Sequence, residues 1–153
     1  MVIQVDTREK ARAITGILRH FEKENIRVLS SKLPVGDYMS LDNARLVIDR
    51  KQNLSELCGN VCQQHARFKR ELQTAQDCEI KLVILCEHGG QIKSLEDVRK
   101  WKNPRSAISP LAMSGERLYA VLLTMGKRYN VDYVFCDKRC TGKEIVRILR
   151  SGR

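Results

Sequence analysis

Residues 35–51 read VGDYMSLDNARLVIDRK, and this stretch determines the fold and the function that we expect for the chain. The Asp-Asn pair at 42–43 is typical of a turn, and residues 44–48 are mostly apolar, as in a short strand. A hairpin folded about this turn would bring Asp37 and Asp49 to the same end of two neighbouring strands. The stretch therefore predicts two carboxylates side by side at one edge of a sheet.

A lysine completes this arrangement. Lys51 lies two residues after Asp49 and therefore on the same face of the strand. Asp37 and Asp49 would supply the oxygen ligands that Mg²⁺ or Mn²⁺ prefers, and Lys51 would stabilise negative charge on a phosphoryl group. The spacing D-(x)11-D-x-K, with Pro34 shortly before it, is that of the PD-(D/E)xK nucleases. The alternative is a Gly-Asp turn and a solvated strand end, because so short a pattern is permissive.

The charge of the chain indicates a polyanionic partner. The 28 lysines and arginines outnumber the 18 aspartates and glutamates, which gives a net charge of +10 at pH 7. Nucleic acid is the commonest such partner, and an aromatic content of 5% favours phosphate contacts over base stacking. The sequence has no signal peptide and no apolar run near the roughly 18 residues of a membrane span. We therefore expect an intracellular, cytoplasmic protein without a membrane partner.

Six cysteines raise the question of disulfides or zinc. An intracellular chain of this size needs no disulfide framework. Cys58, Cys62 and His65 lie near one helical face and could form part of a zinc site. Because Leu54 and Leu57 share the same apolar stripe, however, we favour the interpretation that the cysteines are small core side chains.

Hydrophobic periodicity predicts that strands alternate with helices. We expect strands at residues 2–5, 26–29, 44–48, 81–86 and 133–136, and helices at 11–21, 54–65, 67–77, 94–102, 118–125 and 141–149. Residues 103–116 should form an irregular loop. This order predicts one domain over residues 1–153, a three-layer α/β/α fold with a mixed central sheet. The sequence lacks G-x-G-x-x-G and G-x-x-x-x-G-K-[ST] motifs, so no nucleotide cofactor is expected.

Three motifs give the chain a resemblance to a known family. Residues 5–9 read V-D-T-R-E, residues 36–38 read G-D-Y, and residues 47–51 read V-I-D-R-K. In this order and separation they resemble the XPF-type structure-specific endonucleases, a branch of the PD-(D/E)xK superfamily with a restriction-endonuclease-like fold. The resemblance continues through R-F-K-R-E-L at residues 67–72 and through the apolar strand at 81–86.

This resemblance implies metal-dependent hydrolysis of one DNA strand near branch points, forks or flaps, in DNA repair or recombination. Matched position by position, the family's catalytic residues are Asp6, Asp37, Asp49, Arg50 and Lys51, with Asp6, Asp37 and Asp49 at the metal. Glu9 resembles a supporting glutamate, and Arg8 and Arg50 resemble phosphate or scaffold contacts. Family members usually dimerise, so we expect a homodimer through the apolar helices at residues 118–125 and 145–149.

Further DNA contacts are expected from the helix at residues 67–77. Arg67, Lys69 and Arg70 lie on its polar face, although such a run is often only a solvated surface. Two positions depart from the family pattern: Asp49 replaces its usual glutamate, and Ser55 replaces an aspartate that often follows the lysine.

The sequence also leaves other functions to consider. The chain carries no helicase motif and ends too soon for a tandem helix-hairpin-helix module, so we expect a bare nuclease domain. The main alternative is a catalytically inactive DNA-binding subunit with a nuclease fold. Such a subunit, like an RNA- or protein-binding basic domain, would leave the retained acidic residues and lysine unexplained.

Overall fold

The computed structural model describes residues 1–152, which form strands β1 to β6 and helices α1 to α5. The strands are β1 (Val2–Val5), β2 (Arg27–Ser30), β3 (Tyr38–Ser40), β4 (Asn43–Lys51), β5 (Lys81–Glu87) and β6 (Asp132–Cys136). The α-helices are α1 (Thr15–Lys23), α2 (Leu54–Val61), α3 (His65–Asp77), α4 (Gly115–Tyr129) and α5 (Thr141–Ser151). Short 3-10 helices are η1 (Ala11–Ala13), η2 (Glu96–Lys100), η3 (Pro104–Ala107) and η4 (Lys138–Cys140).

All six strands belong to one mixed sheet in the order β2-β1-β3-β4-β5-β6. The pairs on either side of β3 are antiparallel, and the outer pairs β1-β2, β4-β5 and β5-β6 are parallel. The apolar residues of β5 are buried, as expected for an interior strand covered by helices on both faces. Strands β2 and β6 form the two edges of the sheet.

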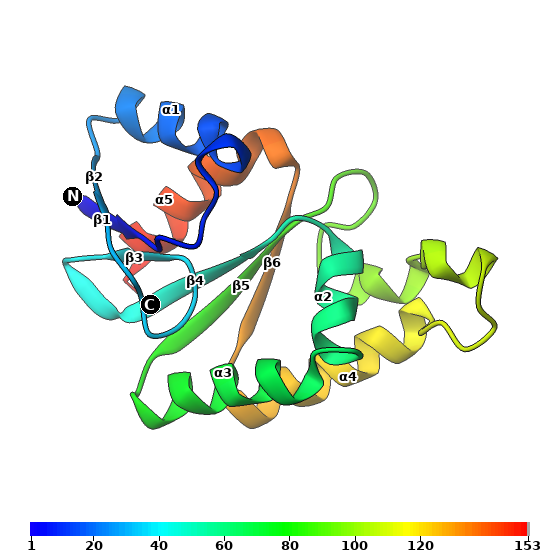
Figure 1. Cartoon of the computed structure of the whole chain (residues 1–153). Coiled ribbons are helices and arrows are strands. Elements are labelled where there is room, and N and C mark those ends of the chain that lie inside the picture. Colours follow the sequence, from blue (N-terminus) through cyan, green and yellow to red (C-terminus); the bar gives the residue numbers. More distant parts are fainter. Residues whose placement is uncertain (153) are drawn as a thin grey trace.

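Helices cover the sheet on both faces (Figure 1). On one face α1 and α5 pack over a core that includes Ile48 and Ile145. On the other face α2, α3 and α4 pack over a core that includes Val47, Leu72 and Leu122. Consecutive residues of β4 thus enter opposite cores, because strand side chains alternate. The predicted three-layer α/β fold with a mixed sheet is confirmed.

Helix caps direct the chain at the ends of two helices near the sheet. Asn53 precedes α2, and its side chain accepts a hydrogen bond of 2.8 Å from the Glu56 amide. Ser114 caps α4 in the same way, and Asn130 ends this helix in the left-handed conformation. Because α2 starts three residues after Lys51, its cap fixes how the chain leaves the end of β4.

Some boundaries differ from those expected. The helix predicted over residues 54–65 ends at Val61, because Cys62 leaves the helical conformation, and α3 then begins at His65. The predicted helix at 11–21 starts as the short 3-10 helix η1 and continues as α1.

The expected dimer surface needs a larger correction. Leu118, Leu122, Ile145 and Leu149 are at most 4% exposed and belong to the two cores of the chain itself. The prediction that these apolar stripes meet a second subunit is therefore wrong. Because Ile148 is also buried, Ile148→Glu is expected to unfold the domain and not to produce a soluble monomer.

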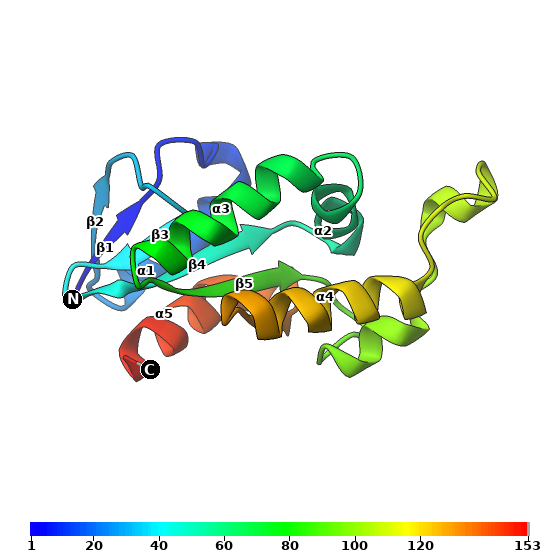
Figure 2. The ribbon, with the colours of Figure 1, turned by 90° about the horizontal axis from the view of Figure 1, so that it is seen from below.

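One segment projects from the domain. Residues 103–114, here called the arm, extend beyond the start of α4 and away from the sheet (Figure 2). The arm occupies most of the stretch expected to be an irregular loop, and it contains η3. Within residues 1–152 no helix has the length and apolar character needed to cross a membrane.

Gly36 allows the close approach of the chain to β4 just before Asp37. It has φ of +64°, and a Cβ atom there would lie 2.6 Å from Val47 Cγ1 and 2.9 Å from the Ile48 carbonyl oxygen. We expect Gly36→Ala to lower the free energy of unfolding by about 1–3 kcal/mol, measured by urea denaturation. The control is Gly16→Ala in α1, where nothing lies within 4 Å and where alanine should not destabilise. Equal stability of the two variants would contradict this account.

Candidate active site

Asp37 joins three strands at one end of the sheet. Its amide donates to the Ile48 carbonyl of β4, and its own carbonyl accepts from the Asp6 amide after β1, each at 2.8 Å. Its carboxylate accepts a third bond, also of 2.8 Å, from the Arg50 amide. This position brings the Asp37 carboxyl group against that of Asp49, which is 4% exposed. The hairpin therefore assembles the two carboxylates as the sequence predicts.

Lys51 lies beside this pair. It shares with Asp49 the sheet face that α2 and α3 cover, and its Nζ is 2.9 Å from Asp49 Oδ2. The ammonium also lies 5.6 Å from the centre of the Phe68 ring of α3. The lysine is almost fully buried, so its charge acts on the carboxylates with little screening by solvent.

One oxygen of this site lacks a hydrogen bond. Within residues 1–152, Asp49 Oδ2 is buried and accepts none, since the Lys51 contact has the distance of an ion pair without hydrogen-bond geometry. Among the described residues, the charge of this buried oxygen is balanced by the Lys51 ammonium 2.9 Å away.

The two carboxyl groups perturb each other's ionisation. Burial, together with the negative charges of Asp49 and Glu9, raises the pKa of Asp37 to about 9. Burial also raises the pKa of Asp49, although the nearby Lys51 ammonium opposes this. Burial alone would lower the pKa of Lys51, but the charge and close contact of Asp49, together with the charges of Glu71 and Asp37, outweigh it and raise that pKa. At neutral pH, Asp37 therefore holds a proton and Lys51 stays positively charged.

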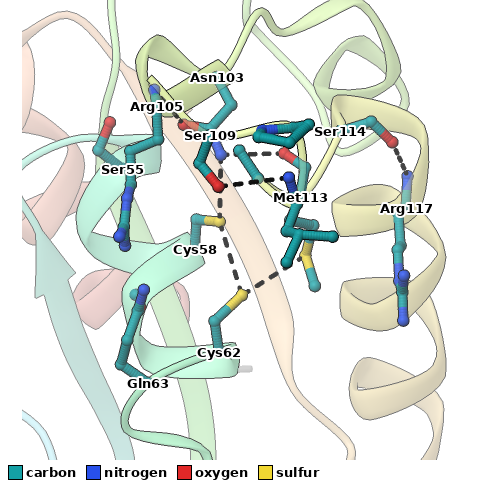
Figure 3. A pocket seen from close by; sticks show the side chains of 14 residues that line it. Ser55, Cys58, Cys62, Gln63, Asn103, Arg105, Ser109, Met113, Ser114 and Arg117 are labelled. Atoms are coloured by element: carbon teal, nitrogen blue, oxygen red, sulfur yellow. Dashed lines mark hydrogen bonds between the residues drawn. The ribbon is translucent and has the colours of Figure 1, made fainter. Parts of the chain in front are cut away.

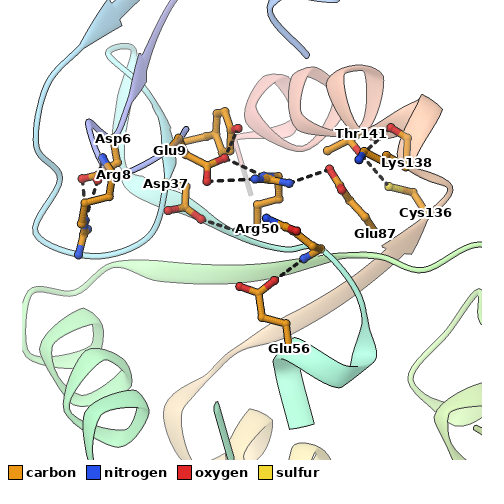
Figure 4. A network of polar contacts seen from close by, with 12 residues as sticks. Asp6, Arg8, Glu9, Asp37, Arg50, Glu56, Glu87, Cys136, Lys138 and Thr141 are labelled. Carbon is orange, nitrogen blue, oxygen red and sulfur yellow. Dashed lines mark hydrogen bonds and ion pairs between the residues drawn. The ribbon is translucent and has the colours of Figure 1, made fainter. Parts of the chain in front are cut away.

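Arg50 faces the opposite side of the sheet and has a different role. Its guanidinium binds both oxygens of Glu9, at 2.7 and 3.1 Å, and donates to Glu87 at 3.2 Å (Figure 4). Tyr38 also donates to Glu9, at 2.6 Å. With its side chain only 3% exposed, Arg50 is a scaffold residue in this structure. The expected DNA contact of Arg50 does not fit this burial.

Asp6 is likewise occupied. Its Oδ1 accepts hydrogen bonds from the Arg8 amide and Nε, and its Oδ2 accepts from Arg8 Nη2 and from the Leu33 amide. Burial raises the pKa of Asp6, but the hydrogen bonds from Arg8 and Leu33 together lower it by more, so the net shift is downward. The carboxylate is therefore ionised, and its hydrogen-bonding capacity is used. The structure therefore does not leave Asp6 free as the expected metal ligand, and it leaves Arg8 half-exposed beside it.

Two acidic residues near the site were missed by sequence reasoning. Glu71 of α3 accepts a 3.0 Å bond from the Gly36 amide, and its charge raises the pKa values of both Asp49 and Lys51. Glu87 ends β5 and binds Arg50. Glu71 lies within the R-F-K-R-E-L stretch and directly follows the basic run, which was the available signal.

The remaining expected residues are distributed over two surfaces. Arg67, Lys69 and Arg70 are exposed on α3, and Lys69 lines a groove of about 380 Å³ between α3 and α4. His65 lines the same groove, whereas Cys58 and Cys62 line a different cavity beside α2. Across residues 1–152, no three His, Cys, Asp or Glu side chains are grouped as a metal site. The alternative zinc set is therefore not assembled.

The fold and the site define an α/β nuclease-type domain. The profile of the ERCC4 domain matches residues 5–148, so the chain belongs to the ERCC4 domain family. A solved structure of XPF from Aeropyrum pernix is similar over 99% of this chain, with 20% identity and a TM-score of 0.69. A second, XPF from Aeropyrum pernix in complex with DNA, is similar over 98%, with 20% identity and a TM-score of 0.67.

These comparisons confirm the resemblance to an XPF-type nuclease domain and its fold. This chain covers 64% of the length of each of the two solved chains. None of the curated protein sequences matches it.

The proton on Asp37 predicts how stability depends on pH without metal. An unfolded aspartate has a pKa of about 3.9, below the value of about 9 in the fold. Between these values the folded state binds more protons, so the free energy of unfolding falls as pH rises. Asp37→Asn removes this titration and should gain stability over the wild type, by a margin that widens from pH 5 to pH 8. Urea unfolding in chelator would measure it, and a constant or shrinking margin would count against the shared proton.

Proposed function

We propose that this chain is a divalent metal-dependent DNA endonuclease that hydrolyses phosphodiester bonds near branched, forked or flap DNA. The observation that carries the proposal is the contact of the Asp37 and Asp49 carboxyl groups, with Lys51 Nζ 2.9 Å from Asp49 Oδ2. Placing the half-buried Asp37 against the buried Asp49 and Lys51 opposes folding, so a chemical use for the three groups is the simplest explanation. XPF-type nuclease domains generally depend on a divalent metal, which agrees with this set.

Asp37 and Asp49 are the residues that would hold the ion. Their carboxylate oxygens suit Mg²⁺ or Mn²⁺, and the Lys51 ammonium beside Asp49 Oδ2 is the charge that such an ion would have to share the carboxylate with. When bound, the metal would polarise the phosphoryl group and lower the pKa of a water ligand. Because ligating carboxylates are deprotonated, Asp37 would release its proton on binding.

The other residues would support the phosphate and the strand. Lys51 remains charged, so it would stabilise negative charge on the phosphoryl oxygens and would not act as a base. Arg50 would keep β4 in place through Glu9 and Glu87 on the opposite face. One face of β4 would therefore carry Asp49 and Lys51 for the reaction, and the other face would carry Arg50 for support.

DNA would approach along α3. Arg67, Lys69 and Arg70 are exposed there, and none forms an ion pair within the part of the chain that the structure describes. Arg67 lies one helical turn before Glu71, which reaches the site at Gly36. The exposed Arg8 would add a phosphate contact on the other side of Asp37.

The first test is cleavage of labelled fork, flap, duplex and single-stranded DNA with Mg²⁺, Mn²⁺ or chelator. Asp37→Asn and Asp49→Asn should lower metal-dependent cleavage by at least about a hundredfold, because each removes a ligand charge with little change in volume. Lys51→Ala should lower it comparably. The control is Asp42→Asn at the exposed far end of the same hairpin. Full cleavage by Asp49→Asn would contradict the assignment of Asp49 as a metal ligand. If the wild type binds DNA but does not cleave it, the alternative of a catalytically inactive DNA-binding subunit would be favoured.

The second test concerns the α3 surface. Replacing Arg67, Lys69 and Arg70 with glutamine should flatten the salt dependence of DNA binding by about one unit of slope per lost phosphate contact. Fluorescence anisotropy from low to moderate salt would measure the slope. A control triple variant at Arg19, Lys23 and Lys143, which are exposed on α1 and α5, should change it less. Equal slopes for the two variants would mean that the α3 side chains are only solvated.

We also propose a homodimer, now through surfaces that the core leaves open. Strand β6 pairs with β5 alone among the strands of residues 1–152, and an open strand edge favours contact with a second chain. Leu123, half-buried on α4 and outside both core clusters, lies one helical turn before Gly126, which packs beside Tyr133 of β6. Light scattering at tens of micromolar should show a dimer, and Leu123→Glu should give a monomer with an unchanged melting temperature. A monomeric wild type would refute the dimer.

A further inference from the structure

A cavity of about 660 Å³ lies between α2, the arm and the start of α4 (Figure 3). Its volume is in the range of small-ligand sites. The side chains that line it come from all three segments and include Ser55, Gln63, Arg105, Leu111, Met113 and Arg117.

A buried asparagine lines the cavity at the base of the arm. Asn103 is 6% exposed, its Nδ2 donates to the Met113 carbonyl at 2.9 Å, and its Oδ1 accepts from the Arg105 amide at 3.0 Å. One side chain thus ties the two ends of the arm together. The base of the arm is therefore closed by hydrogen bonds beside the cavity.

The lining is basic and partly apolar. Arg105 and Arg117 are both exposed, and within residues 1–152 neither guanidinium forms a hydrogen bond or an ion pair. Among the residues that the structure describes, no aspartate or glutamate lines the cavity. Beside them, Leu111 is 92% exposed although it is a large apolar side chain. Two free cations next to exposed apolar groups fit a strand whose phosphates and bases are both accessible.

The cavity also lies where such a strand could reach it. Helix α2 starts three residues after Lys51, and Ser55 in its first turn lines the cavity. In Figure 3 the Arg105 side chain extends along α2 between Ser55 and Gln63. A DNA strand that leaves the active site along α2 would therefore meet this guanidinium.

We propose that the cavity binds an unpaired DNA strand, with phosphates at Arg105 and Arg117 and bases against Leu111 and Met113. This proposal rests on the proposed nuclease function and adds a contact for one part of its substrate. It would give the domain a preference for substrates with a single-stranded arm. A duplex is too wide for the cavity, and its bases are stacked inside it.

The test compares binding of a labelled fork with two unpaired dT arms and of a blunt duplex, by anisotropy in chelator. For Arg105→Ala/Arg117→Ala we expect fork affinity to fall about tenfold and its salt slope by about 1.4, at about 0.7 per single-strand contact. Duplex affinity should stay near that of the wild type. The matched control is Arg19→Ala/Lys143→Ala, which removes the same charge from the opposite side of the sheet. Equal losses for fork and duplex, or for the two double variants, would overturn the proposal.

A second comparison tests the base contact. Leu111→Ser should weaken binding of the dT-armed fork but not of the same fork with abasic arms, and equal effects on both would overturn this contact. Thermal melting of each variant confirms that it is folded. If the wild-type protein cleaves no DNA, the proposed nuclease function is refuted, but the binding of fork and duplex can still be compared. Loss of fork preference alone would refute only the cavity.

Discussion

The contact of the half-buried Asp37 with the buried Asp49 is the constraint on which the rest of the site depends. Two carboxyl groups in contact disfavour a second negative charge, so Asp37 keeps a proton, while the Lys51 ammonium stays charged beside Asp49. The backbone makes this contact unavoidable, because Asp37 is hydrogen-bonded to the chain on both sides, at Ile48 and at Asp6. The unfavourable electrostatics are therefore held in place by the sheet, and a divalent ion would relieve them.

Strand β4 separates the chemistry from its support by the simple alternation of side chains. Asp49 and Lys51 face α2 and α3, whereas Arg50 between them faces α1 and α5. There it binds Glu9 and Glu87, which come from the loop after β1 and from the end of β5. The ion pairs of Arg50 thus connect the strand to both halves of the sheet without entering the face that carries Asp49 and Lys51.

Local spacing was enough to predict the hairpin, the Asp37–Asp49 pair and the position of Lys51, because the period of two in strands fixes which residues share a face. It was not enough for Glu71 and Glu87, since their place in the site depends on how α3 and β5 pack. Nor could periodicity separate a core stripe from an interface, so the helix around Leu122 was assigned to a partner and proved to be core. The order of elements, read from pattern alone, still predicted the three-layer fold.

The central claim is that Asp37 and Asp49 together hold one divalent ion. Its most direct test is anomalous diffraction from crystals grown with Mn²⁺ at neutral or higher pH. The account predicts a single strong anomalous peak within about 2.0–2.4 Å of oxygens of both carboxylates, with Lys51 remaining beside Asp49. A peak at Asp6, at the sulfur atoms of Cys58 and Cys62, or at no position near Asp49 would contradict it.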